Sequence, residues 1–377
     1  MTRILLTELG NTASGDSALW AESVRRLEGM GASVTLLHRL PDVSALDAHK
    51  MTRQRRVRLP LPDLPMVQSP DDLLATMQAL SPEAYSRLQR EVAEHDWLAI
   101  APGGRFLEGY RYQKALVAAA EAMRQGKPFI VLHQSIGPLG RSPAIDLLRT
   151  LFRRAALVVV RDDRSLVYVR KLLGSLPSVV RSRDPLLVGG VPASEKPEFA
   201  VGLNFRFGRN GWVDPGGVTA LCKRLRSRSI WPVLLYTTTH VLPEDLQQVA
   251  AAMGIEAIPD VLAPPEIHTV PGRCAVNVTD SFHGGIFSVT SERPAVFCQS
   301  DFASWKFSGT FCGGGLANQI HPGPVSAFRR FTLMRRIMAA HANPGAWMER
   351  QTRDLATNRA LVETGWEAVA NVIGRHD

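Results

Sequence analysis

The chain of 377 residues has no apolar run that approaches the roughly 20 residues needed to cross a bilayer as a helix. Its 4 cysteines are few and scattered without CxxC spacing, so neither a zinc site nor a disulfide scaffold is predicted. The opening segment, residues 1–8, becomes acidic too soon for a signal peptide and is interpreted as a first strand. These absences favour a cytoplasmic protein.

Two kinds of motif are also missing. No Asp-x-Asp sequence occurs, which argues against a sugar transferase that holds its donor through a metal, and no metal site is predicted. No nucleic-acid-binding motif with interleaved aromatic residues occurs, so nucleic acid is not an expected partner.

What the chain does have is an excess of basic residues. Its 44 Lys and Arg residues against 35 Asp and Glu residues give a formal net charge of +9. Part of the excess lies in two arginine clusters, within residues 53–58 and 329–336. Such clusters suit a phosphorylated small molecule or anionic lipid headgroups, and equally an ordinary solvated surface. A position at the inner face of the cell membrane therefore stays open beside a fully cytoplasmic one.

Short apolar segments alternate with helical patterns and predict an α/β fold with doubly wound parallel sheets. A Pro-rich, basic stretch at residues 41–70 is predicted as a long loop. The alternation stops at residues 189–197 and then restarts, which indicates a domain boundary. The predicted strands are residues 33–37, 97–100, 129–132, 157–160, 199–204, 232–236, 274–276 and 294–298.

Three parts of the chain follow from this pattern. Residues 1–193 form an N-terminal domain and residues 194–342 a C-terminal domain, each of ordinary domain size. Residues 343–377 form a helical segment that is predicted to pack back across the domains, with Trp347 and Trp366 available for the packing.

Residues 277–285, Asn-Val-Thr-Asp-Ser-Phe-His-Gly-Gly, are the most informative part of the chain. A buried strand is predicted to end here, and a helix to begin with Asp280 or Ser281 as its N-cap. Gly284 and Gly285 remove side-chain bulk, so that a ligand can approach the backbone N–H groups closely. His283 lies where an anion would bind and a proton could be delivered. A capped helix without a ligand is the alternative.

Ligands of open parallel sheets bind beyond the carboxyl ends of the strands. Six polar or glycine-rich turns follow predicted strands directly and are therefore expected to gather on the rim of each sheet. Together they predict a shared ligand cleft. The turns are residues 10–16, 103–105, 134–135, 161–162, 204–206 and 280–285.

The ordered set of these motifs resembles the polysaccharide pyruvyl transferase family over about residues 10–301. The resemblance implies two Rossmann-like domains in a GT-B-like arrangement, with the acceptor on the N-terminal domain and the donor on the C-terminal domain. The motifs that carry it are Asn11 with Gly15-Asp16, Gly103-Gly104, Gln134-Ser135-Ile136-Gly137-Pro138, residues 160–165, Asp184-Pro185, and residues 279–284 followed by Arg293-Pro294.

Characterised members of that family move pyruvate from phosphoenolpyruvate onto a sugar as a ketal, without a cofactor. The implied partners are a phosphorylated donor and a sugar or polysaccharide-precursor acceptor. One departure leaves the donor open: where the family has Arg-Leu before the histidine, this chain has Ser281-Phe282. A GT-B-type nucleotide-sugar glycosyltransferase and a non-catalytic subunit of a polysaccharide assembly system stay open as alternatives. The oligomeric state is not predicted.

The predicted catalytic residues are His283, Arg206 and Asp280. His283 is the predicted general acid, and Arg206 and Lys306 are predicted to neutralise the phosphate or carboxylate of the donor. Two structural alternatives stay open: Asp16 as a helix cap, and Arg161 in an ion pair with Asp162. The predicted substrate-binding residues are Ser281, Gly284, Gly285, Asn204, Lys306, Asp16, Gly103, Gly104, Arg105, Gln134 and Arg161.

Overall fold

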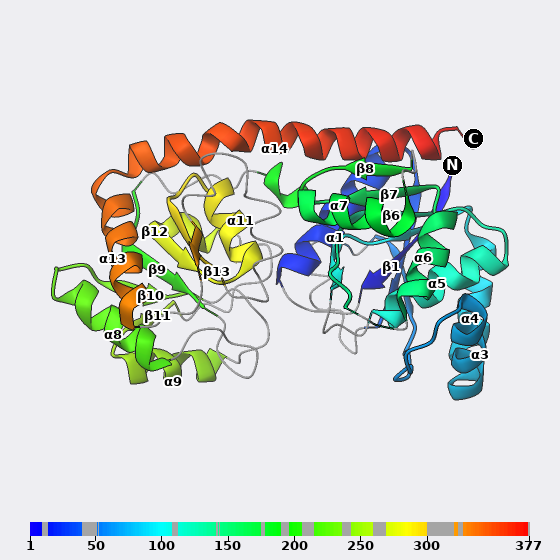
Figure 1. Cartoon of the computed structure of the whole chain (residues 1–377), viewed down its shortest axis with the longest axis horizontal. Coiled ribbons are helices and arrows are strands. Elements are labelled where there is room, and N and C mark those ends of the chain that lie inside the picture. The colour runs from blue at the N-terminus through cyan, green and yellow to red at the C-terminus, as the bar shows by residue number, and fades with distance from the viewer. Residues whose placement is uncertain are drawn as a thin grey trace. The chain divides into compact units, whose positions relative to one another are not determined.

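The computed structural model describes residues 1–9, 14–39, 51, 53–107, 112–140, 142, 144–174, 178–189, 196–205, 215–235, 243–258, 269–299, 320–322 and 327–375. The chain divides into two compact units, each with its own sheet (Figure 1). The first unit comprises Met1–Thr12, Asp16–Pro185 and Ala360–Asp377, and the second comprises Ala13–Gly15 and Leu186–Arg359. The contacts thus divide the chain at residue 185, whereas the sequence pattern places the boundary at residue 193.

The first unit is built on one parallel sheet. Its strands are β1 (Arg3–Leu9), β2 (Ser33–His38), β3 (Arg55–Arg58), β4 (Trp97–Ile100), β5 (Gly103–Phe106), β6 (Phe129–Ile136), β7 (Leu157–Val160) and β8 (Val179–Arg181). They follow the order β3-β2-β1-β4-β6-β7-β8, and β5 pairs with β6. Every residue of β4, β6 and β7 is buried, which is typical of parallel strands covered on both faces.

Helices cover this sheet. They are α1 (Ser14–Gly29), which belongs to the first unit from Asp16 onward, α3 (Pro70–Leu80), α4 (Pro82–Glu94), α5 (Gln113–Arg124), α6 (Ala144–Arg154) and α7 (Asp163–Leu173). The alanine-rich helix α5 contacts β1, β4 and β6, because small side chains allow a helix to approach a sheet closely. Ser69 caps α3 by accepting a hydrogen bond from the backbone N–H of Asp72 at 3.1 Å.

Three strands of this sheet differ from the prediction. β3 lies inside the stretch predicted as a loop. It pairs in parallel with β2, with Val57 opposite Leu37, and Val57 is the one buried residue of its four. The glycine pair predicted as a turn is the start of β5, where Gly103 pairs with Gln134 of β6. β6 itself continues to Ile136, because its polar side chains find hydrogen-bond partners inside the unit.

The second unit repeats the architecture with the parallel strands β9 (Phe199–Asn204), β10 (Pro232–Leu234), β11 (Glu256–Ala257), β12 (Cys274–Thr279), β13 (Ala295–Gln299) and β14 (Ile320–Pro322). Their order is β11-β10-β9-β12-β13-β14. The helices are α8 (Pro215–Arg226), α9 (Pro243–Met253), α11 (Phe282–Thr290) and α13 (Ala327–Ala342).

Alternation along β13 buries both faces of the second sheet. Val296 and Cys298 pack in the cluster that contains Leu333 and Ile337 of α13. Ala295 and Phe297 belong to a different cluster, which contains Ile286 and Val289 of α11. Successive residues of one strand therefore serve two helical layers, as a doubly wound sheet requires.

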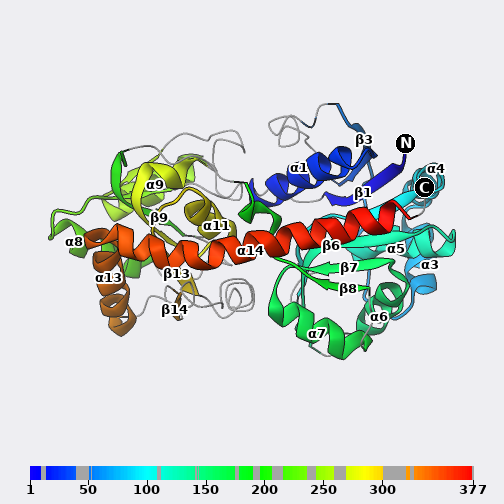
Figure 2. The same ribbon diagram turned by 90° about the horizontal axis from the view of Figure 1, so that it is seen from above.

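The C-terminal helix α14 (Pro344–Ile373) contributes to both units. Within the second unit, the indole Nε1–H of Trp347 donates to the carbonyl oxygen of Ala295 at 3.2 Å. Within the first unit, the ring of Trp366 lies 4.6 Å from that of His133. The C-terminal half of α14 lies beside β6 in Figure 2, in agreement with this contact. Both tryptophans are buried, whereas packing of the segment across the domains stays a prediction.

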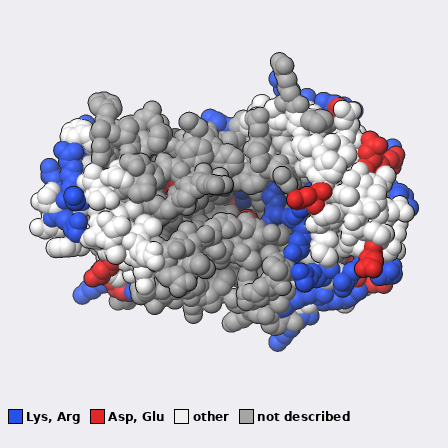
Figure 3. All heavy atoms as spheres, turned by 90° about the horizontal axis from the view of Figure 1, so that it is seen from below, with Lys and Arg blue, Asp and Glu red and all other residues white. Residues whose placement is uncertain are grey.

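The basic residues are spread over the surface, and part of their charge is compensated locally. Arg55 of β3 forms a two-fold contact with Glu91 of α4, at 2.8 and 2.9 Å. Arg56 donates to the carbonyl oxygen of Met51 at 2.8 Å. On the face drawn in Figure 3, described Lys and Arg side chains cover more area than Asp and Glu. Residues 55–58 are therefore a partly paired edge strand rather than a free cationic loop.

Candidate functional site

The segment 279–285 of the second unit has the predicted strand-to-helix geometry. β12 ends at Thr279 and α11 begins at Phe282. Ser281 is the N-cap, and its hydroxyl oxygen accepts a hydrogen bond from the backbone N–H of Gly284 at 3.3 Å. The hydroxyl oxygen of Thr279 accepts from the N–H of Ser281 at 2.9 Å. Of the two predicted cap residues, Ser281 is therefore the one that caps the helix.

The paired glycines are required by packing. A Cβ atom on Gly284 would overlap the side-chain amide of Asn204, and one on Gly285 would overlap the ring of Phe297. The N–H of Gly284 donates to the Ser281 hydroxyl, and the N–H of Gly285 donates to the Ser281 carbonyl oxygen at 3.0 Å. Both donors are engaged inside the helix cap. A role of these two glycines in substrate binding stays a prediction.

Two predicted site residues meet at the carboxyl edge of the second sheet. β9 and β12 are adjacent and parallel, with Asn204 opposite Thr279. The backbone N–H of Asp280 donates to the carbonyl oxygen of Asn204 at 3.2 Å. The side chains are deeply buried, since Asn204 is 3% and Asp280 is 1% exposed. Asn204 and Asp280 therefore mark the carboxyl edge of the second sheet, next to the turn from which His283 projects.

His283 is half-buried in the first turn of α11. Its ring centroid lies 5.4 Å from that of Phe282 and 6.5 Å from that of Phe287. Gly15, which belongs to the second unit, lies against the imidazole, and a side chain at Gly15 would overlap the ring. The rings of Phe282 and Phe287 and the backbone of Gly15 thus restrict the orientation of the His283 side chain. The other two predicted anion ligands, Arg206 and Lys306, lie outside the described residues.

The first unit brings a different pair of predicted residues together. Asp16, in the first turn of α1, lies 3.8 Å from Nη2 of Arg105 on β5. Both side chains are 17% exposed, so the pair retains access to solvent. Gly103 lies on the same strand as Arg105, and a Cβ atom added to it would lie 3.8 Å from the side-chain amide of Gln134, without overlap. Asp16 and Arg105 are thus two partly exposed polar residues that lie close together in the first unit.

Gln134 and Arg161 are, in contrast, structural in their contacts. Gln134 is 1% exposed, and its side-chain amide donates to the carbonyl oxygen of Ala101. Arg161 is also 1% exposed, and its guanidinium donates to the Ser135 hydroxyl at 2.9 Å and to Asp184 at 2.6 Å. The structural alternative predicted from the sequence paired Arg161 with Asp162. In the structure, the ion-pair partner of Arg161 is Asp184.

Asp162 instead joins the same buried network as the cap of α7. Its carboxylate accepts hydrogen bonds from the Ser165 backbone N–H at 2.7 Å and from the hydroxyls of Ser135 and Ser165, each at 2.8 Å. Burial raises the pKa of the Asp162 carboxyl above its usual range, and the hydrogen bonds from Ser165 and Ser135 oppose that shift. Three of the sequence motifs, around residues 135, 161–165 and 184, therefore meet in one polar core.

His133 is a second buried polar residue of the first unit, and the sequence analysis assigned it no role. The imidazole of His133 is fully buried next to Trp366, and its Nδ1 lies 3.0 Å from the Ser182 hydroxyl. Burial lowers the pKa of His133 to about 3, helped by the positive charges of Arg161 and Arg26. His133 directly precedes the Gln-Ser-Ile-Gly-Pro motif, which is the one signal that could have drawn attention to it.

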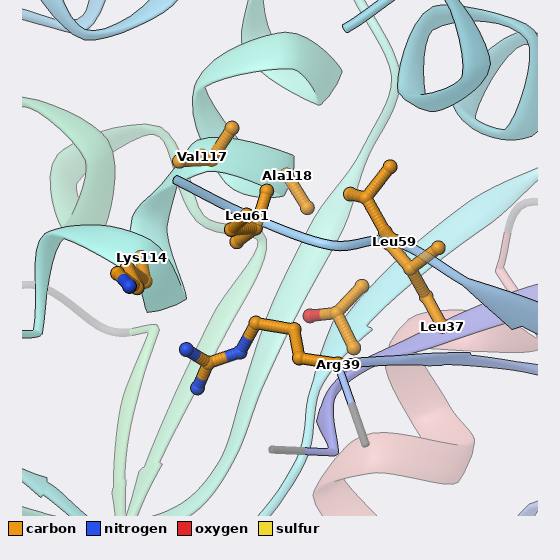
Figure 4. A pocket seen from close by; sticks show the side chains of 8 residues that line it. Leu37, Arg39, Leu59, Leu61, Lys114, Val117 and Ala118 are labelled. Carbon is orange, nitrogen blue, oxygen red and sulfur yellow. The ribbon is translucent and has the colours of Figure 1, made fainter. Parts of the chain in front are cut away.

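The edge of the first sheet also has a small pocket, shown in Figure 4. Leucine side chains form one wall, and the guanidinium of Arg39 extends away from Leu37 and Leu59. The pocket has a volume of about 20 Å³, which suffices for one water molecule but not for a substrate. This pocket is therefore not the donor site. The remaining lining residues are Thr7, Leu61, Lys114, Val117 and Ala118.

Solved structures with the same fold cover the whole chain. UDP-GlcNAc 2-epimerase from Neisseria meningitidis bound to UDP-GlcNAc has a TM-score of 0.62 and 8% identity over 99% of this chain and 100% of that one. MnaA from S. aureus with UDP has a TM-score of 0.65 and 13% identity over 100% and 97%. HepE from Anabaena in complex with UDP has a TM-score of 0.62 and 13% identity over 100% of both chains. No curated protein matches the chain.

These likenesses and the two doubly wound sheets define the class: the chain has a GT-B-like fold of two Rossmann-like domains with a C-terminal helix. The sequence profile described as Polysaccharide pyruvyl transferase matches residues 14–301. The chain therefore belongs to the polysaccharide pyruvyl transferase family and is a transferase of polysaccharide biosynthesis. Among the helices of the described residues, none has the length and apolar character needed to cross a membrane.

Proposed function

We propose that this protein transfers the pyruvyl group of phosphoenolpyruvate onto two hydroxyls of a sugar in a polysaccharide or its precursor, forming a ketal. The family match over residues 14–301 is the observation that carries the proposal. The position of His283 supports it: the ring is half-buried in the first turn of α11, at the carboxyl edge of a parallel sheet. Ligands of such sheets bind at that edge.

The chemistry assigned to His283 is general acid catalysis. The imidazolium donates a proton to C3 of the enol phosphate, which makes C2 electrophilic. One sugar hydroxyl adds to C2 and gives up its proton. Phosphate leaves with the C2–O electron pair, and a second hydroxyl closes the ketal. Of the two hydroxyl protons, one restores the imidazolium and the other goes to the released phosphate. The balance is phosphoenolpyruvate plus a sugar diol giving the pyruvyl ketal plus inorganic phosphate.

The neighbours of His283 have positioning roles in this proposal. Asp280 is 1% exposed, and its backbone N–H donates to the carbonyl oxygen of Asn204 at 3.2 Å, which holds the turn to β9. The Ser281 cap fixes the first turn of α11, from which His283 projects. Anion binding is assigned to Arg206 and Lys306, because fixed cations stabilise a donor that carries several negative charges.

A second candidate is transfer from a nucleotide sugar. The solved structures of MnaA and HepE with the same fold are complexes with UDP, which favours this alternative. The replacement of the family's Arg-Leu by Ser281-Phe282 also leaves room for a different donor. The family match argues against the third alternative, a non-catalytic subunit of a polysaccharide assembly system.

Thermal unfolding of the purified chain with candidate donors separates these three functions. A donor at a hundred times its dissociation constant adds about 2.7 kcal/mol to the free energy of unfolding. Stabilisation by phosphoenolpyruvate, but not by pyruvate or inorganic phosphate alone, is the expected result. Stabilisation by UDP- or GDP-sugars would favour glycosyl transfer. No stabilisation by any donor would favour the non-catalytic subunit.

A further inference from the structure

The second unit has a groove at the edge opposite to the candidate site. The groove has a volume of about 600 Å³ and lies at the amino ends of three strands, where β9, β10 and β11 begin with Phe199, Pro232 and Glu256. Asn204 and Asp280, in contrast, lie at the carboxyl ends of β9 and β12. The groove is therefore separate from the rim that holds His283.

Trp231 is the main feature of this groove, and the residue is 66% exposed. The residue is held firmly from both sides. Ile230 before it is buried, and its backbone N–H donates to the Leu225 carbonyl oxygen at 3.1 Å, while Pro232 after it begins β10. An exposed indole on a fixed backbone presents a flat apolar surface with little loss of conformational entropy on binding.

The polar side chains of the groove are carboxylates and a guanidinium. Glu198, Glu256 and Arg226 line it. Glu198 is oriented by a two-fold contact with Arg273, at 2.6 and 3.0 Å, and the Arg273 guanidinium lies 5.4 Å from the centre of the Phe199 ring. Positive and negative charges are thus balanced around the groove. A balanced lining does not favour a phosphate or a polyanionic chain.

A flat aromatic face next to planar hydrogen-bonding groups is the combination that recognises sugars. The C–H groups of a sugar ring pack on the aromatic face, and its hydroxyls exchange hydrogen bonds with carboxylates and guanidinium groups. We propose that this groove is a second, non-catalytic carbohydrate-binding site that holds an uncharged segment of a polysaccharide against Trp231. That the polysaccharide is also the acceptor rests on the proposed function; the groove's preference for sugar does not.

The test is binding of the full-length protein to an array of bacterial polysaccharides that includes neutral and anionic members. The wild-type chain and F331A, which removes another exposed aromatic residue of the same unit, should retain the same neutral glycans. W231A should bind them at least about tenfold more weakly, whereas W231F, which keeps an aromatic face, should stay within about threefold. Because Trp231 is exposed, the melting temperature of W231A should match that of the wild type.

Several results would overturn the proposal: an array on which the wild-type chain retains no glycan, equal binding by W231A, or retention of anionic glycans only. Self-association of the wild-type chain that W231A abolishes would instead make the groove a protein interface. Phosphate release from phosphoenolpyruvate should be the same in W231A and wild type with a monosaccharide acceptor. If no variant releases phosphate while the Trp231-dependent glycan binding persists, the proposed function fails and the groove assignment stands.

Discussion

The guanidinium of Arg161 and the carboxylate of Asp184 lie 2.6 Å apart with both side chains buried in the first unit. The two residues come from motifs 23 positions apart in the sequence. Ser135 and Asp162 extend the pair into a network of hydrogen bonds. Motifs that resemble ligand-binding elements thus have their polar groups directed into the protein interior.

Breaking this pair from one side is expected to destabilise the fold strongly. Arg161→Met and Asp184→Asn should each lower the free energy of unfolding by about 3–5 kcal/mol, because each leaves a buried group without its charged partner. Urea denaturation followed by circular dichroism measures the loss. The double variant should lose clearly less than the sum of the two single losses.

The control for this prediction is an exposed ion pair of the same unit. Arg181 and Asp163 lie 2.6 Å apart with side chains that are 46% and 45% exposed. Removing that pair by Arg181→Ala should cost no more than about 1 kcal/mol. Equal losses for Arg161→Met and Arg181→Ala would contradict the structural role of the buried pair.

The glycine pair of the second unit gives a second prediction. Gly285→Ala should lower the free energy of unfolding by about 1–3 kcal/mol, since the new methyl group would overlap the ring of Phe297. Adding Phe297→Leu should recover part of the loss. Gly345→Ala is the matched control in the same unit, because no atom lies within 4 Å of its Cβ position. It should leave stability unchanged or raise it by up to about 1 kcal/mol.

The buried His133 predicts a pH dependence of stability. Its pKa is lowered to about 3 in the folded state, so between about pH 6.5 and pH 3 the unfolded state binds the proton and the folded state does not. Stability should therefore fall as the pH drops below 6.5. At pH 5 the loss from this group is about 2 kcal/mol relative to pH 7.

Urea denaturation of His133→Asn at pH 7 and pH 5 checks this prediction. Asparagine is chosen because residue 133 has φ of +37°, a value that asparagine tolerates better than most residues. The variant should be less stable than the wild type at pH 7, but its stability should change less between the two pH values. If the variant and the wild type lost the same stability between pH 7 and pH 5, His133 would not titrate on unfolding.

Much of the fold could be predicted from the sequence, because buried parallel strands are continuous apolar runs. The strands at residues 97–100 and 157–160 were predicted with the observed bounds. β3 was missed because three of its four residues are arginines, and its single inward side chain, Val57, is too weak a signal. β5 was missed because its opening glycine pair is more typical of a turn.

The candidate site was predicted less completely than the fold. The cap at Ser281 follows from local sequence, since the capping bond joins residues three positions apart. The partners of Arg161 and His133 could not be predicted, because they lie 23 and 49 residues away and depend on the packing of separate strands. A glycine pair can make room for a ligand or for other side chains of the protein, and local sequence does not distinguish the two. At Gly284 and Gly285 the space is filled by Asn204 and Phe297.

Release of inorganic phosphate from phosphoenolpyruvate, measured with and without a sugar acceptor for the wild type and His283→Ala, is the decisive test of pyruvyl transfer with His283 as the general acid. Acceptor-dependent release by the wild type is expected, with mass spectrometry detecting the pyruvyl ketal, and His283→Ala should be slower by at least about 100-fold. An unchanged melting temperature of the variant would exclude misfolding as the cause. Turnover of His283→Ala within a few-fold of the wild type, or no acceptor-dependent phosphate release by the wild type, would contradict the account.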